Sequence, residues 1–120
     1  MTKRLLIIED DIFMRDMLSL IVEDGGFSVV GADDGAQALA ILQQDQDFAA
    51  IISDLYLPDC KGVELFQSVQ QAAPAIPFMI LSGESDDAIV AEAKQLGIVY
   101  VVKDMNVADT LLTTIEHLIM

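Results

Sequence analysis

Short apolar segments alternate with longer segments of helical periodicity along the whole chain. The apolar segments are rich in Leu, Ile and Val and predict strands buried on both faces, at residues 4–9, 27–32, 48–53, 77–82 and 99–102. Apolar residues at helical spacing follow each one and predict helices over 11–26, 34–45, 61–73, 85–97 and 106–120. Parallel strands need connections of this length, so the pattern predicts an open, doubly wound α/β domain with a five-stranded parallel sheet. Periodicity alone leaves the strand order open.

The helical segments also predict inward faces and ends. The expected inward stripes are Ile12, Met14, Met17, Leu18, Ile21 and Val22 in the first helix, Ala36, Leu39 and Leu42 in the second, and Leu111, Leu112, Ile115 and Leu118 in the last. Ser85 and Asn106 are the expected N-caps of the last two helices, and Gly97 is expected to end the helix before it.

Composition narrows the class of protein. A chain of 120 residues with 53% hydrophobic residues predicts one folded domain over 1–120. Twenty acidic residues against six basic ones give a formal net charge of −14, and no stripe of Lys and Arg exists, which excludes direct binding to nucleic acid phosphates.

No apolar run approaches the ~18 residues of a membrane span, and acidic residues interrupt the first run, so no membrane segment and no signal peptide are predicted. The single cysteine, Cys60, cannot form an internal disulfide, which predicts a reducing compartment and hence the cytoplasm.

Polar side chains gather where the predicted strands end. The strand ends carry Glu9-Asp10-Asp11, Asp33-Asp34, Asp54, Ser82-Gly83-Glu84 and Lys103-Asp104. Ligands of open α/β sheets bind outside these carboxyl ends. We interpret Asp11 and Asp34 as helix caps. Asp54 either caps a turn or performs chemistry.

A carboxylate cluster forms if the first and third strands are neighbours, because Glu9, Asp10 and Asp54 then converge. Like charges so close together raise each other's pKa or require a cation, and Mg²⁺ suits carboxylate ligands. Lys103 adds a positive charge, and Ser82 adds a hydroxyl. An Asp carboxylate beside a metal, a Lys and a Ser indicates a phosphoryl-transfer site with Asp54 as the attacking group.

With these residues in place, the chain resembles the receiver domain of two-component response regulators over essentially its whole length. The matching residues are Glu9-Asp10, Asp54 in "IISDLYLPDCKG" with Pro58 and Gly62, Ser82 in "MILSGE", and Tyr100 and Lys103 in "YVVKD". The resemblance implies a flavodoxin-like fold with strand order 2-1-3-4-5, which places the first strand beside the third.

The resemblance also implies roles for single residues. Asp54 is expected to accept a phosphoryl group from a sensor histidine kinase or a histidine phosphotransfer protein. Asp10, Asp54 and the backbone carbonyl of Tyr56 are the expected Mg²⁺ ligands, with Glu9 acting through a water.

The phosphoryl group itself has three further expected partners. Lys103 is expected to pair with it, Ser82 to donate a hydrogen bond to it, and Tyr100 to move inward as Ser82 shifts. The face formed by residues 86–120 is the expected readout surface for a downstream effector or output domain, and it is also the candidate surface for a homodimer. Catalysis is expected only of the domain's own phosphorylation and dephosphorylation.

Some positions depart from the family pattern. Asp104 replaces the usual proline after Lys103, so the Lys103–Asp104 peptide bond is expected to be trans or else strained, because a non-proline cis bond costs about 2.5–4 kcal/mol. Gly83 stands where Ala is usual. Tyr56 and Glu84 occupy positions that tune dephosphorylation.

Two other functions stay open. A pseudo-receiver would keep the fold and bind partners without phosphate. A Mg²⁺-dependent phosphohydrolase would use Asp54 as nucleophile, but Tyr56 stands where its second acid is expected. The sequence fits a stand-alone regulator and equally a receiver joined to an output domain.

Overall fold

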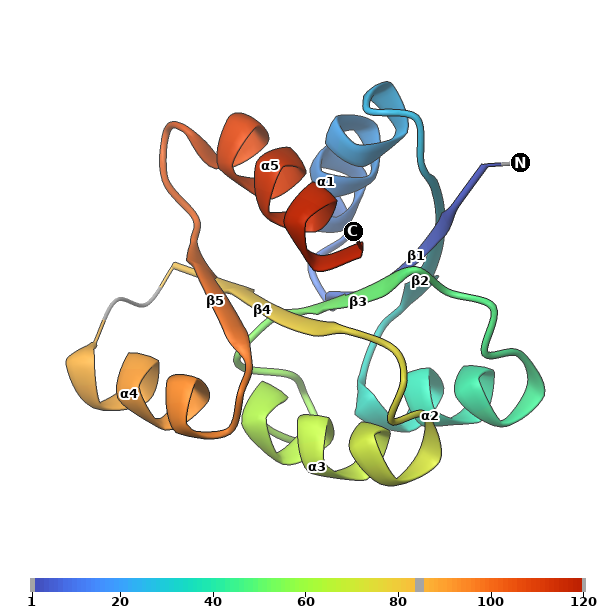
Figure 1. The fold of residues 1–120 in the computed structure, drawn as a ribbon, viewed down its shortest axis with the longest axis vertical. Helices are drawn as coiled ribbons and strands as arrows, with labels where there is room; N and C mark the ends of the chain where they lie inside the picture. The colour runs from blue at the N-terminus through green and yellow to red at the C-terminus, as the bar shows by residue number, and fades with distance from the viewer. Residues whose placement is uncertain (1, 84–85, 120) are drawn as a thin grey trace.

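The computed structural model describes residues 2–83 and 86–119, in which five strands alternate with five helices (Figure 1). The strands are β1 (Arg4–Ile8), β2 (Ser28–Ala32), β3 (Ala50–Ser53), β4 (Phe78–Ser82) and β5 (Val99–Val102). The helices are α1 (Ile12–Asp24), α2 (Gly35–Gln44), α3 (Gly62–Ala72), α4 (Asp87–Gln95) and α5 (Val107–Ile119). The predicted types and order are confirmed, and only the ends of elements differ by one or two residues.

The strands form a single parallel sheet in the order β2-β1-β3-β4-β5, as the resemblance implies. β1 therefore lies beside β3, and Ile8 pairs with Ser53 at the last register position. The next residues, Glu9 and Asp54, leave the sheet together at the same edge. The order of the strands thus decides which acidic residues meet.

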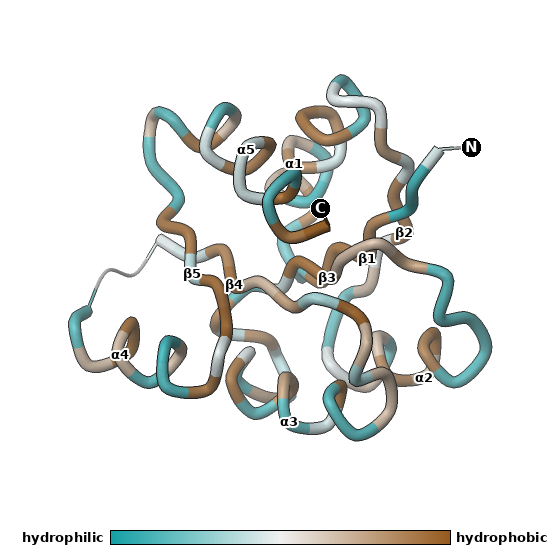
Figure 2. The backbone as a smooth tube through the Cα atoms, viewed as in Figure 1, coloured by the Kyte–Doolittle hydropathy of each residue, from teal (hydrophilic) through white to brown (hydrophobic). Residues whose placement is uncertain are grey.

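The helices cover both faces of the sheet. Figure 1 shows α1 and α5 on one face and α2, α3 and α4 on the other. Side chains alternate along a strand, so Leu5 and Ile7 pack under α1 and α5, while Leu6 and Ile8 pack toward α2 and α3. In Figure 2 the hydrophobic strands lie in the middle and most hydrophilic segments lie outward. The long apolar runs of the sequence are explained by this double burial.

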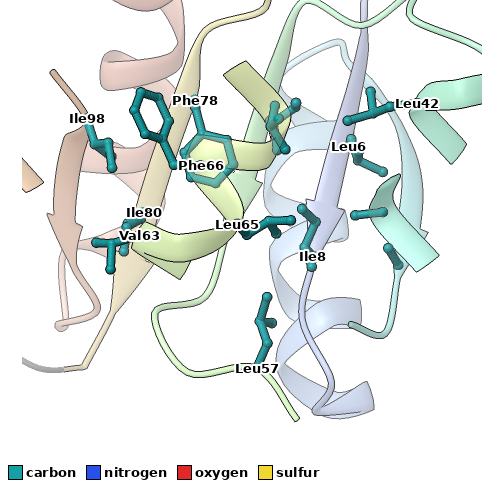
Figure 3. Close-up of a cluster of buried hydrophobic side chains, with 14 of the residues drawn as sticks. Leu6, Ile8, Leu42, Leu57, Val63, Leu65, Phe66, Phe78, Ile80 and Ile98 are labelled. Carbon is teal, nitrogen blue, oxygen red and sulfur yellow. The ribbon is translucent and has the colours of Figure 1, made fainter. Parts of the chain in front are cut away.

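Aromatic and branched side chains fill the core on the α2–α4 face, shown in Figure 3. The rings of Phe66 on α3 and Phe78 on β4 meet edge to face, with centroids 5.3 Å apart. This geometry is favourable for aromatic pairs.

The predicted inward stripe of α1 is partly wrong. Leu18 and Val22 are buried, but Ile12 and Met17 are exposed. With 3.6 residues per turn, Ile12 and Met17 lie about 100° or more around the helix from Leu18, beyond the reach of the sheet. In α2, Ala36 is likewise exposed, and Ala38 is buried in its place.

Helix ends also differ from expectation in detail. Asp86 is the N-cap of α4 and accepts a hydrogen bond from Ala88 N at 2.8 Å. Ser85, the expected cap, lies outside the described residues, as does Glu84. Gly97 directly follows Leu96, the C-cap of α4. Its φ of 79° is a conformation that favours glycine, as expected for the residue that ends this helix. The carbonyl of Asn106 accepts the first bond of α5, from Thr110 N. Within residues 2–83 and 86–119, no helix is long and apolar enough to cross a membrane.

Candidate functional site

Three carboxylates converge at the carboxyl edge of the sheet. Glu9, Asp10 and Asp54 each offer an oxygen, and these oxygens lie within 4.8 Å of one another. Two backbone bonds of 3.0 Å hold their chain segments, from Glu9 N to the carbonyl of Ala32 and from Asp54 N to that of Ile8. The predicted convergence is therefore present, and we call these three residues the carboxylate cluster.

Lys103 reaches the carboxylate cluster from β5. Its Nζ donates a hydrogen bond to Glu9 Oε1 at 3.0 Å and lies 3.5 Å from Asp54 Oδ1. Its backbone N donates to the carbonyl of Ser82 at 2.7 Å, which ties the end of β5 to the end of β4. The ammonium group is thus held between two carboxylates contributed by two other strands.

The cluster is electrostatically unbalanced. The Glu9 side chain is only 3% exposed, and this burial raises the pKa of its carboxyl above the ordinary value. The hydrogen bond from Lys103 lowers that pKa, and the negative charge of Asp54 raises it. Three carboxylates face one ammonium group, so negative charge remains. Oxygen ligands with excess negative charge are suited to a hard cation, and the residues present fit Mg²⁺.

Ser82 and Tyr100 lie on the neighbouring strands β4 and β5. Ser82 is buried at the end of β4, where it pairs with Val102. Tyr100 pairs with Ile80, two residues further from the edge, and packs against the core on the α2–α4 face. The structure brings Ser82 to the same edge as the carboxylate cluster, while Tyr100 stands behind that edge.

The loop after Asp54 is closely packed. Leu55 N donates to Asp54 Oδ1 at 2.8 Å, which orients the carboxylate. A Cβ on Gly62 would lie 2.6 Å from the backbone oxygen of Asp54, so a side chain at this position would displace Asp54. Tyr56 is 49% exposed on this loop.

Two of the acids at strand ends are helix caps, as interpreted from sequence. Asp11 accepts from Phe13 N and Met14 N, and Asp34 accepts from Gln37 N. Neither belongs to the carboxylate cluster. The cap interpretation is confirmed for both.

Sequence reasoning missed Asp59. Its two carboxylate oxygens accept hydrogen bonds from the first two backbone N–H groups of α2. These bonds lower the pKa of the Asp59 carboxyl. Nothing in the sequence around Asp59 indicates that this loop residue contacts the start of a helix 23 or 24 residues earlier in the chain.

The peptide bond after Lys103 is trans, as expected, since the described part of the chain contains no cis peptide bond. Asp104 accepts from Asn106 N at 2.9 Å within its own loop. Its carboxylate is thereby engaged by the backbone that leads into α5.

α1 carries most of the large apolar side chains that are exposed. They are Ile12, Phe13, Met17 and Leu20, and outside α1 only Tyr56 and Met105 are comparable among the described residues. Phe13 is the most exposed of the four, at 88%. Single exposed apolar residues are ordinary, so it is their concentration on one helix that distinguishes α1.

Comparisons with known proteins agree with this geometry. A model of the response regulator receiver domain matches residues 5–116. Transcriptional regulatory protein FixJ of Bradyrhizobium diazoefficiens is 33% identical over 93 residues, which are 78% of this chain and 45% of FixJ. This chain spans about half the length of the first curated relatives that it matches.

Solved structures share the fold. Chemotaxis protein CheY4 of Vibrio cholerae is 31% identical, with 98% of this chain and 99% of that chain covered and a TM-score of 0.87. Response regulator protein TrrA of Thermotoga maritima, solved in complex with Mg²⁺-BeF, is 22% identical with the same coverage and a TM-score of 0.86, a likeness of fold.

The match of the family model over nearly the whole chain, the strand order and the carboxylate cluster at the sheet edge all lead to one assignment. The chain belongs to the response regulator receiver domain family of two-component signalling.

Proposed function

We propose that this receiver accepts a phosphoryl group on Asp54 in a Mg²⁺-dependent reaction and that the modification alters a surface read by a partner. One observation carries the proposal. Carboxylate oxygens from the ends of β1 and β3 lie within 4.8 Å of one another, and Lys103 Nζ is 3.0 Å from Glu9 and 3.5 Å from Asp54. An acidic residue that merely capped a turn would need neither the other two carboxylates nor the lysine.

Asp10, Asp54 and the Tyr56 carbonyl would hold the metal, and Glu9 would act through a water. Glu9 is buried and already accepts a hydrogen bond from Lys103, so contact with the metal through a water would suit it. Asp10 is exposed and could bind the metal directly. Bound Mg²⁺ supplies positive charge to the transferring phosphoryl oxygens. TrrA, solved with Mg²⁺-BeF, provides a precedent within the shared fold.

The Asp54 carboxylate would attack phosphorus in line, as nucleophiles do in phosphoryl transfer. Lys103 would exchange part of its contact with Glu9 for the new phosphoryl oxygens. Ser82, at the same edge, would donate a hydrogen bond to them. The phosphoryl group brings more charge and more acceptor oxygens than a carboxylate, so both residues interact differently after transfer.

Phosphorylation would alter the face formed by α4, β5 and α5, within residues 86–120. Met120 lies outside the described residues. Lys103 directly follows β5, at the start of the loop to α5, so a change in its partner would reach this face through the backbone. Tyr100 would follow Ser82 inward. The equilibrium between the inactive and active arrangements of this face would shift only by the difference in their interaction energy with the phosphoryl group. A downstream effector, an output domain or a second copy of the chain would bind this face.

The phosphodonor would be a phosphohistidine on a sensor histidine kinase or a phosphotransfer protein. The exposed apolar residues of α1, Phe13 above all, begin just after Asp10 and the helix cap Asp11, and they would offer the donor a docking surface near Asp54. Residues 1–120 would act as one receiver domain. Because the chain spans about half the length of the first curated relatives, an output domain in the whole protein would be an alternative to a separate effector. A reducing compartment, the cytoplasm, suits the free thiol of Cys60.

The test is to incubate the chain with Mg²⁺ and a small phosphodonor such as acetyl phosphate and to locate the product by mass spectrometry. We expect one phosphoryl group on Asp54, none on the Asp54→Asn variant, and none in the presence of a metal chelator. Equal phosphorylation of wild type and variant would remove Asp54 from the role.

The same experiment separates the alternatives. A pseudo-receiver would bind Mg²⁺ or partners without becoming phosphorylated. A phosphohydrolase would turn over phosphate esters many times, and Tyr56 in place of a second acid speaks against it.

A further inference from the structure

The loop after Asp54 is anchored at its tip to the start of α2. Asp59 Oδ1 accepts a hydrogen bond from Gly35 N and Oδ2 accepts one from Ala36 N, both at 2.9 Å. These N–H groups belong to the first turn of α2 and have no partner within the helix. Asp34, the N-cap, accepts from Gln37 N at 2.8 Å. Two aspartates from different parts of the chain thus share the start of one helix.

The contact between loop and helix leaves no room for a side chain. Gly35 is buried, and a Cβ placed on it would lie 2.6 Å from Cys60 Sγ and 3.3 Å from Asp59 Oδ1. α2 and α3 lie on the same face of the sheet and contact each other (Figure 1). The loop that leads into α3 is therefore pressed against the beginning of α2.

The loop itself is a small hairpin. Gly62 N donates to the carbonyl of Leu55 at 2.6 Å, and Leu57 N donates to that of Cys60 at 2.9 Å. Tyr56 faces Lys61 between these two bonds in an antiparallel bridge. β3 and α3 fix the base of the hairpin, and Asp59 fixes its tip.

We propose that Asp59 is a positioning residue that holds this hairpin, and with it the Tyr56 carbonyl, in the place required for Mg²⁺ binding. The inference rests on the proposed function, in which that carbonyl is a metal ligand. Mg²⁺ demands near-ideal octahedral geometry, so a backbone ligand must be held in place before the metal binds. A hairpin released at its tip would have to be ordered on binding, at a cost in conformational entropy.

The test compares Asp59→Ala with Asp34→Ala, a matched control. Each variant removes one carboxylate charge and one side-chain cap from α2, but only Asp59 connects α2 to the hairpin. Mg²⁺ affinity is measured by titrating the ¹⁵N-labelled chain with MgCl₂ and following the amide resonances of residues 55–57 and 59–62. Thermal unfolding is measured in parallel.

We expect Asp59→Ala to raise the Mg²⁺ dissociation constant about tenfold, the lower end of what loss of outer support costs a metal site. Asp34→Ala should lose thermal stability but keep the dissociation constant of wild type. Asp59→Asn keeps one acceptor oxygen and should fall between wild type and Asp59→Ala, which preserves the test if the alanine variant does not fold.

Two results would overturn the inference alone: an unchanged dissociation constant in both Asp59 variants, or an equal rise in Asp34→Ala. A wild-type chain that binds no Mg²⁺ would overturn the proposed metal site, and this inference with it.

Discussion

Gly62 controls how closely the start of α3 approaches Asp54. It is buried, and a Cβ on it would lie 2.6 Å from the backbone oxygen of Asp54. Backbone atoms cannot move aside as the end of a flexible side chain can. The glycine is therefore required by the close approach of two backbone segments, whereas in the sequence Gly62 stands out only as one of the residues that match the receiver family.

Gly62→Ala is expected to lower the free energy of unfolding by about 1–3 kcal/mol, as overpacking does. Gly83→Ala is the control, because a Cβ there meets nothing within 4 Å, and it should change stability by less than about 0.5 kcal/mol. Urea unfolding of both variants measures the difference. Equal effects of the two substitutions would contradict the steric account.

Cys60 is a second residue whose surroundings decide its chemistry. Burial, followed by the charge of Asp59, raises the pKa of its thiol from 9.0 to about 11. Only the thiolate is nucleophilic, but a thiolate of higher pKa also reacts faster, which offsets part of the effect. The folded chain should therefore be alkylated by iodoacetamide at pH 8 about tenfold more slowly than the chain in urea. Alkylation at the same rate in both states would show that the thiol is accessible and ordinary.

At the scale of elements, α1 has two apolar faces with different roles. One packs on the sheet through Leu18 and Val22, and the other exposes Phe13 and Leu20. The sequence pattern could not separate them, because eight of the eleven residues from 12 to 22 are apolar and cover much of the helix circumference. Only the position of the sheet shows which face remains open.

Leu18→Ala should cost about 2–5 kcal/mol of stability, because Leu18 is 2% exposed and its removal leaves a cavity. Leu20→Ala, on the same helix with 69% exposure, should stay within about 0.5 kcal/mol. Chemical denaturation gives both values. A large loss for Leu20→Ala would mean that the outer face of α1 is packed in solution, for instance in an oligomer.

For the whole molecule, a formal net charge of −14 opposes folding through self-repulsion. Any salt should screen this repulsion and raise stability. The carboxylate cluster concentrates the same repulsion at one edge of the sheet, where Lys103 contacts only two of the three carboxylates, those of Glu9 and Asp54. A cation that binds there specifically must stabilise the fold beyond the general salt effect.

MgCl₂ should therefore raise the melting temperature more than NaCl does at matched ionic strength. At ten times its dissociation constant, a bound ligand adds about 1.4 kcal/mol to stability. Asp10→Asn should abolish the difference between the two salts, while Asp16→Asn, which removes an exposed charge from α1 outside the cluster, should keep it. Calorimetry measures all three proteins. A difference that persists in Asp10→Asn would place the bound Mg²⁺ elsewhere.

The kind and order of the elements could be predicted from the amino-acid sequence, because strands buried on both faces and helices buried on one have different apolar periods. It also identified Glu9, Asp10, Asp54 and Lys103 as candidates, since they all stand at or just after the end of an apolar strand. Their convergence required β1 to lie beside β3, which periodicity left open and the resemblance implied.

Features that depend on contacts between segments distant in the chain became visible only in the folded structure. The bonds from Asp59 to the start of α2, the fit of Gly62 against Asp54 and the open face of α1 are of this kind. A local pattern records the preferences of a segment, whereas these features depend on which surface the fold brings against it. That is why the carboxylate cluster was foreseen from strand ends, and the hairpin that supports it was not.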